Sequence, residues 1–144
     1  MDNDQQIRCL IPNLEPRTTD HEAMRSHKDL DVWKQAITLA KIVYQTTGEY
    51  PKEEMFGLVS QMRRAAVSIA SNIAEGAARH GNKEFIQFLY VAVGSASELD
   101  TQLEISKAAG FIEAGKFNAM QEAVSRITQM LYGLIRATKS KQTT

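Results

Sequence analysis

The sequence lacks the features that mark membrane proteins, disulfide-stabilised proteins and strongly charged proteins. Its 144 residues contain no apolar run near the roughly 18 residues that a transmembrane helix needs. It has a single cysteine, Cys9, so no disulfide can form within one chain. Its 17 basic and 17 acidic residues leave no net charge. We therefore expect a cytoplasmic protein without a signal peptide.

Zero net charge argues against indiscriminate binding of nucleic acid or membranes, but the charges are unevenly placed. No acidic residue follows Glu122, whereas Arg126, Arg136, Lys139 and Lys141 do. This basic strip is typical either of a binding patch or of cations that favour the negative end of a helix dipole.

The sequence also lacks the residue patterns that carry catalysis or bind metals. No acidic residue has a histidine three positions later, as di-metal helical bundles require. Glu98, Asp100 and Glu104 crowd one predicted helix, and we interpret them as a solvated surface rather than an acid–base pair. No phosphate-binding loop, nucleophile elbow or cysteine cluster occurs. We predict no metal, no cofactor, no catalytic residue and no enzymatic activity.

Composition divides the chain into three segments. Residues 1–26 contain Pro12 and Pro16, show no sustained periodicity and hold five acidic against three basic residues, so we expect a flexible leader there. Its apolar residues either dock on a neighbouring chain or another partner, or belong to a tail that has no binding role. They are Ile7, Cys9, Leu10, Ile11 and Leu14. Residues 27–139 form the predicted bundle domain, and residues 140–144 a frayed tail.

Four stretches repeat apolar residues at alternating steps of three and four, which places them on one face of an α-helix. The predicted helices run from 29 or 31 to 48, from 51 to about 79 and from 83 to about 109, and the fourth follows the connector 111–115. The predicted core positions are, helix by helix, Trp33, Ile37, Ala40 and Tyr44; Met55, Val59, Met62, Ala66, Ile69 and Ile73; Phe85, Leu89, Ala92, Ala96, Leu99 and Leu103; and Phe117, Met120, Val124, Ile127, Leu131 and Leu134.

Polar residues, proline and glycine mark the predicted helix ends. Asp29 or Asp31 is expected to accept a bond from a free amide of the first turn, and Pro51 suits the first position of the second helix. Gly81 is expected to end that helix in the left-handed conformation, with Asn82 capping the next one.

Two further rows predict surfaces on these helices. On the second helix, Arg64, Ser68, Ser71 and Glu75 lie about 200° from the core row and should point away from the core. The third helix has a second apolar row, which predicts a contact between subunits, with Ser68 and Ser71 as further interface candidates. That row is Ile86, Tyr90 and Val93. Gly94, in the middle of this helix, fits close helix contact because glycine there costs about 1 kcal/mol relative to alanine.

These elements predict an all-α protein, an antiparallel up-down-up-down four-helix bundle that assembles into a closed homo-oligomer. Short connectors of two to six residues favour antiparallel neighbours, and no strand pattern competes.

Residues 28–138 resemble a bacterial family of four-helix bundles encoded in intervening sequences of 23S ribosomal RNA genes, which includes the accessory variability determinant of diversity-generating retroelements. The resemblance is carried by residues 29–36, 61–66, 68–76, 84–89, 94–95 and 98–104. The motif residues that we single out are Arg63, Ser68, Asn72, Glu75 and Gly76. Members often have proline where Ala70 stands and a glycine-aromatic-glycine run at 76–78, and Ala70 should leave the second helix straighter.

The resemblance implies a homopentameric ring without known catalytic activity. In the retroelement branch it implies a basic adaptor that contacts nucleic acid and a reverse transcriptase. The alternative is a stand-alone protein that acts only as a protein-binding assembly module. We expect neither a membrane nor a small-molecule substrate as partner.

Nucleic acid, if bound, is expected to be held through its phosphates by cations that a ring of subunits repeats. Because no aromatic residue interleaves with these cations in the sequence, binding should tolerate any base sequence. The alternative is that the arginines only pair with helix neighbours such as Glu75. The candidates are Arg64, Arg79 and Lys83, followed by Arg126, Arg136 and Lys139.

Overall fold

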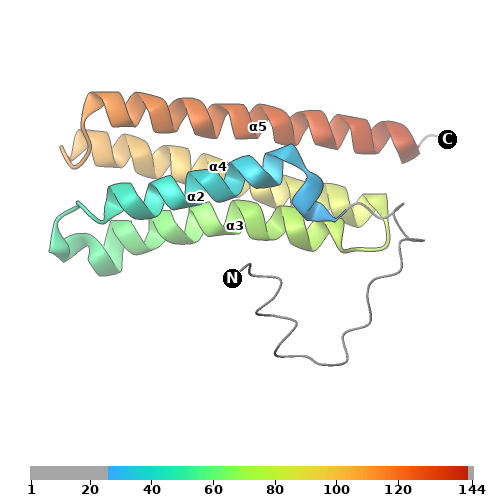
Figure 1. Cartoon of the computed structure of the whole chain (residues 1–144), viewed down its shortest axis with the longest axis horizontal. Helices are drawn as coiled ribbons and strands as arrows, with labels where there is room; N and C mark the ends of the chain where they lie inside the picture. The colour runs from blue at the N-terminus through green and yellow to red at the C-terminus, as the bar shows by residue number, and fades with distance from the viewer. Residues whose placement is uncertain (1–25, 143–144) are drawn as a thin grey trace, which may run out of the picture.

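The computed structural model describes residues 26–142, and all regular secondary structure within them is helical. Figure 1 shows four long helices lying side by side, which confirms the predicted all-α class. They are α2 (Asp31–Thr47), α3 (Ser60–Ala77), α4 (Asn82–Ala108) and α5 (Ala114–Gln142). Apart from Ser26, the predicted leader lies outside the described residues.

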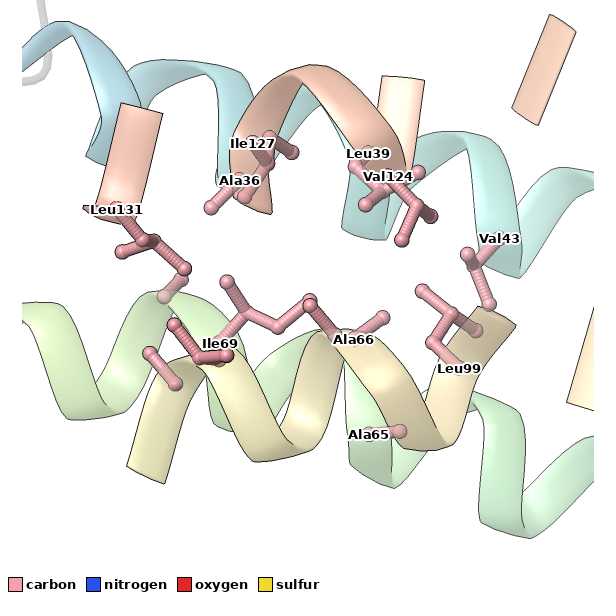
Figure 2. Close-up of a cluster of buried hydrophobic side chains, with 14 of the residues drawn as sticks. Ala36, Leu39, Val43, Ala65, Ala66, Ile69, Leu99, Val124, Ile127 and Leu131 are labelled. Atoms are coloured by element: carbon pink, nitrogen blue, oxygen red, sulfur yellow. The ribbon is translucent and has the colours of Figure 1, made fainter. Parts of the chain in front are cut away.

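One hydrophobic core joins the four helices. Figure 2 shows side chains from every helix meeting at the centre, among them Leu39 of α2, Ile69 of α3 and Leu99 of α4. Across them lie Ile127 and Leu131 of α5, and these five side chains are almost fully buried. No helix within residues 26–142 combines the length and hydrophobicity needed to cross a membrane.

The predicted core faces of α3, α4 and α5 are confirmed, with exceptions near helix ends. Met55 precedes α3 and is exposed, and Phe85 is only half-buried. On α5, Leu134 is half-buried and the neighbouring Ile135 occupies the core instead.

The predicted core face of α2 is wrong by one residue. The buried row is Val32, Ala36, Leu39 and Val43, not the row that begins at Trp33. Both rows follow the same four-three-four spacing, so periodicity alone does not choose between them. The second row lies along the seam between α2 and α3, where Trp33 and Ala40 pack against the edge of the core and Ile37 and Tyr44 stay exposed.

Several predicted helix ends also differ. A short 3₁₀ turn, η2 (His27–Asp29), precedes α2, and Ser26 caps it by accepting a hydrogen bond from the Lys28 amide at 3.2 Å. Leu30 then stands at the N-cap of α2, so neither aspartate caps that helix. α3 ends at Ala77 rather than Arg79.

Gly81 is extended rather than left-handed, with φ of −124°, and it is the N-cap residue of α4. Asn82 is therefore the first helical residue and not the cap. The left-handed glycine is Gly110, after α4, with φ of 77°. At the other end of the chain, α5 continues to Gln142, through part of the segment where we predicted fraying.

The connection from α2 to α3 is an irregular helical segment. A 3₁₀ turn, η3 (Lys52–Glu54), leads into a π-helical turn, η4 (Met55–Val59), in which Gly57 has non-helical φ and ψ of −113° and −111°. Pro51 is the N-cap of η3 and does not begin α3 directly. The irregular turn leaves the Phe56 side chain 97% exposed.

We expect Leu99→Ala to lower the free energy of unfolding by about 2–5 kcal/mol, because it removes a fully buried side chain from the centre of the core. Val91→Ala, at an exposed position on the same helix, should change it by less than about 0.5 kcal/mol. Urea unfolding followed by circular dichroism measures both values. Equal losses of stability in the two variants would contradict the described core.

Candidate nucleic-acid interface

Four of the six predicted cations gather where α3 ends, α4 begins and α5 approaches its C-terminus (Figure 1). We call this group the cationic end. Arg79 follows α3, Lys83 lies in the first turn of α4, and Arg136 and Lys139 lie in the last turns of α5. All four side chains are exposed.

Two aromatic side chains of α4 show that these cations surround the same part of the bundle. The Arg79 guanidinium lies 5.1 Å from the centre of the Phe88 ring. The Lys139 ammonium donates a hydrogen bond to the Tyr90 hydroxyl at 3.0 Å and lies 5.4 Å from the centre of that ring. Since Phe88 and Tyr90 are two positions apart, they point to different flanks of α4, and α4 stands between the two cations.

Arg79 and Glu75 form an ion pair one helical turn apart, with 3.0 Å between Nη2 and Oε1. This is the pairing that we gave as the alternative to nucleic-acid binding. Both side chains are about half exposed, so the pair adds little to stability and can exchange for another anion. Within residues 26–142, Lys83, Arg136 and Lys139 form no ion pair with an acidic side chain.

Arg64 and Arg126 do not belong to the cationic end. Arg64 is exposed in the first half of α3, 15 residues before Arg79, which corresponds to roughly 22 Å along a helix. Arg126 lies in the middle of α5, where its Nη2 is 3.8 Å from Glu122 Oε1. The six predicted cations therefore do not form one surface on a single subunit.

The motif residues of the resemblance mostly hold helices together. Arg63 of α3 donates one hydrogen bond to the Thr47 hydroxyl at 3.0 Å and another to the Tyr44 carbonyl at 3.3 Å. Its guanidinium also lies 4.6 Å from the centre of the Tyr44 ring. Because these contacts join the C-terminal turn of α2 to α3, Arg63 fixes the spacing between the two helices.

Ser68 and Asn72 form a polar contact between α3 and α4. The Ser68 and Ser95 hydroxyl oxygens are 2.8 Å apart, and the Asn72 amide donates to the Ser68 hydroxyl at 2.9 Å. Ser68 therefore faces α4, unlike the rest of its predicted row, since Arg64, Ser71 and Glu75 lie on the more exposed side of α3. Ser95 belongs to the segment 94–95 that carries the resemblance, but the sequence did not predict this partner for it or its burial in α4.

Gly76 marks the closest approach of α3 to α4. A Cβ at this position would lie 2.6 Å from Phe88 Cβ and 3.0 Å from the Phe85 ring. Real Cβ atoms almost never come that close to a neighbour, so only glycine fits here without a shift of the helices. Arg63, Ser68, Asn72 and Gly76 thus contribute to contacts within and between helices, whereas the fifth motif residue, Glu75, is exposed and pairs with Arg79.

The predicted interface row on α4 is largely accounted for within the subunit. Ile86 and Val93 are each only 8% exposed, because α4 has α3 on one flank and α5 on the other. Tyr90 is exposed and contacts Lys139. Ile86 and Val93 are therefore not available to a second copy.

A shallow groove of about 830 Å³ between α4 and α5 is lined mainly by hydroxyl and amide side chains, with Asp100 and Glu122 as its carboxylates. No group of three or more histidine, cysteine or acidic side chains within residues 26–142 is arranged to hold a metal ion.

A buried polar cluster lies near the ends of α2 and α4. Burial raises the pKa of the Tyr50 hydroxyl, an effect that the nearby Ser106 hydroxyl partly offsets. Ser106 donates instead to the Gln102 carbonyl at 2.8 Å, and the Tyr50 oxygen has no hydrogen-bond partner among the described residues. A phenol whose pKa is raised is held in its neutral form. We therefore interpret Tyr50 as a core residue and not as a reactive one.

These features define an all-α protein built as a helical bundle. Residues 28–133 match the family described as 23S rRNA-intervening sequence protein, and the chain belongs to that family, as the resemblance predicted.

A solved structure from Bacteroides thetaiotaomicron is similar to the bundle, with a TM-score of 0.65 and 23% sequence identity. The likeness covers 72% of this chain and 97% of that one, which is described as a protein with unknown function from the S23 ribosomal protein family. At this identity the likeness shows the fold alone. No curated protein matches the chain.

Gly76→Ala is expected to lower the free energy of unfolding by about 1–3 kcal/mol, because the added methyl group overpacks the α3–α4 contact. Gly133→Ala on α5 is the matched control, since its Cβ would meet only the Arg136 side chain at 3.9 Å. That variant should raise stability by about 0.5–1 kcal/mol through helix propensity. If Gly76→Ala were as stable as Gly133→Ala, the close approach would be wrong.

Proposed function

We propose that this protein is a non-enzymatic nucleic-acid-binding adaptor that acts as a ring of identical subunits, each an antiparallel up-down-up-down bundle. The observation that carries the proposal is the cationic end, where Arg79, Lys83, Arg136 and Lys139 from three parts of the chain surround the start of α4. Exposed cations on both flanks of the start of α4 give a protein of zero net charge a local positive region that a polyanion can contact.

Binding through this end is directed at phosphates rather than bases. The two aromatic rings close to these cations are those of Phe88 and Tyr90, and each already has a cation against it. The sequence predicted no aromatic residue among these cations. In the structure aromatic side chains do lie among them, and each ring packs against a cation. Contacts to phosphates position a nucleic acid without reading its sequence, so affinity should depend weakly on base sequence.

Assembly into a ring, with five subunits by resemblance, would repeat the cationic end around one axis. Gly94 supports a contact between copies. It lies in the interior of α4, where glycine costs about 1 kcal/mol relative to alanine, yet a Cβ there would meet nothing within 4 Å in its own subunit. The neighbouring Val91 is exposed, and Ser71 of α3 is exposed as well. A second helix can approach such a surface closely.

The retroelement branch of the resemblance implies a reverse transcriptase as the protein partner. The proposed ligand of the cationic end is nucleic acid in the cytoplasm. The second candidate function is a protein-binding assembly module that binds no nucleic acid. It is favoured by the exposed apolar side chains on α2 and α3, among them Ile37, Tyr44 and Val67.

Electrophoretic titration with RNA and DNA tests the cationic end. We expect Lys83→Ala/Arg136→Ala/Lys139→Ala to weaken binding and to flatten its dependence on salt, by a log–log slope of about 0.7–0.9 for each phosphate that the variant no longer neutralises. Lys52→Ala/Lys107→Ala/Lys116→Ala removes the same charge at other exposed positions and should retain most of the affinity. Equal affinities and salt slopes in both variants would refute this site, and an absence of binding by the wild type at low salt would favour the assembly module.

Light scattering tests the ring. We expect the wild type to be a closed oligomer at micromolar concentration and Gly94→Leu to dissociate it, because the new side chain fills the space that a neighbouring helix would occupy. Gly133→Leu, on α5, should leave the mass unchanged. A monomeric wild type would contradict the ring, and an unchanged mass for Gly94→Leu would exclude this face as the contact.

A further inference from the structure

An apolar surface runs along the outside of the bundle over the seam between α2 and α3. We call it the seam strip and define it by Trp33, Ile37, Ala40 and Tyr44 of α2 and Val67, Ala70 and Ala74 of α3. Ile37, Tyr44 and Val67 are 45%, 47% and 43% exposed. Large side chains of this kind that gather on one face of a monomer usually mark a site of interaction.

The two halves of the seam strip face each other. Arg63 reaches from α3 to the Tyr44 ring and the Tyr44 carbonyl, so its face of α3 lies next to α2. Val67, Ala70 and Ala74 follow Arg63 at steps of four, three and four, and therefore continue that face along the helix. Ala70 is buried and Ala74 is half-buried, so the strip is exposed chiefly at Ile37, Tyr44 and Val67.

The seam strip has positive charges along its length, and acidic residues flank both segments that carry it, Asp31 and Glu49 around the first and Glu54 and Glu75 around the second. Residues 32–48 and 55–74, which contain the whole strip, include four cations and no aspartate or glutamate. The cations are Lys34, Lys41, Arg63 and Arg64. An apolar surface with positive charge along its length fits a segment that combines apolar and acidic residues.

A second copy of the same surface does not fit well. In a two-fold contact each surface meets its own copy, so the lysines and Arg64 of one subunit would approach those of the other. Like charges brought together in this way oppose association. An acidic occupant is therefore favoured over a second seam strip.

The chain itself contains an acidic apolar segment directly before α2. Residues 1–25 hold five acidic and three basic residues, together with Ile7, Leu10, Ile11 and Leu14. We propose that this leader docks on the seam strip of its own chain, with its apolar side chains against Ile37, Tyr44 and Val67 and its carboxylates near the cations of α2 and α3.

The length of the leader allows this contact. The 12 residues from Leu14 to Ser26 span up to roughly 40 Å when extended. α2, which begins five residues after Ser26, has 17 residues and is about 25 Å long, so the leader can reach any point of the strip. Attachment to the same chain also makes the effective concentration of the leader high, of millimolar order for a short flexible linker.

The chain carries its own probes for a test. Trp33, which lies in the seam strip, is its single tryptophan, and Cys9 in the leader is its single cysteine. A nitroxide attached to Cys9 of the full chain should quench Trp33 fluorescence about twofold or more if the docked state is populated half of the time or longer. A chain labelled with the diamagnetic analogue of the nitroxide gives the unquenched reference.

Variants of the full chain show whether the contact is the proposed one. Leu10→Ser/Ile11→Ser in the leader and Lys34→Glu/Lys41→Glu at the strip should each remove most of the quenching. Ile105→Ser, at an exposed apolar residue outside the strip, and Lys52→Glu/Lys107→Glu, outside it as well, should leave the quenching unchanged. Quenching that all four variants retain, or that the wild type lacks, would overturn the proposal.

Dilution separates docking within one chain from docking between chains. When labelled protein is mixed with a tenfold excess, or roughly that, of unlabelled Trp33→Phe protein, docking within one chain leaves Trp33 quenched, whereas docking between chains brings unlabelled leaders to Trp33 and removes the quenching. A loss of quenching on dilution would show that the leader binds a neighbouring copy and would overturn docking on the same chain. Neither result depends on nucleic-acid binding, so these measurements test leader docking independently of the proposed function of the cationic end.

Discussion

The close contact between α3 and α4 is the constraint on which the rest of the bundle depends. At Gly76 the two helices approach so closely that a methyl group would collide with Phe88 and Phe85. Two turns earlier on α3, Ser68 and Ser95 satisfy each other's hydroxyl groups at a distance of 2.8 Å. A small residue and a short polar pair thus fix the distance between these helices, and the larger side chains of α2 and α5 fill the space that remains (Figure 2).

The sequence predicted the helices well because each apolar row had a period that only a helix satisfies. It failed where two rows had the same period. On α2 the row from Val32 and the row from Trp33 differ by one position, and both are apolar since one faces the core and the other lies over the seam with α3. It failed again at η4, where an extra residue in the turn moves Met55 out of the row, because π-helical turns leave no distinct spacing pattern.

The candidate site could be predicted only in part. The cations themselves were visible, but their grouping depends on which turns of different helices lie together, and Tyr90 and Lys139 are 49 positions apart. Arg64 and Arg79 were placed on one helix and expected to act together, yet several turns separate them, and Glu75 already contacts Arg79. Periodicity describes one helix at a time, whereas a binding surface is formed by several helices.

The exposed Phe56 has a consequence for how the chain can be cut and still hold together. A side chain that is 97% exposed, in a turn where Gly57 departs from helical geometry, is an accessible substrate for a protease that cleaves after aromatic residues. Cleavage there would separate α2 from the other three helices covalently but leave the core row of α2 in place between α3 and α5. A cut at this exposed turn would therefore give two fragments that share one core, which makes the bundle a template for a split protein.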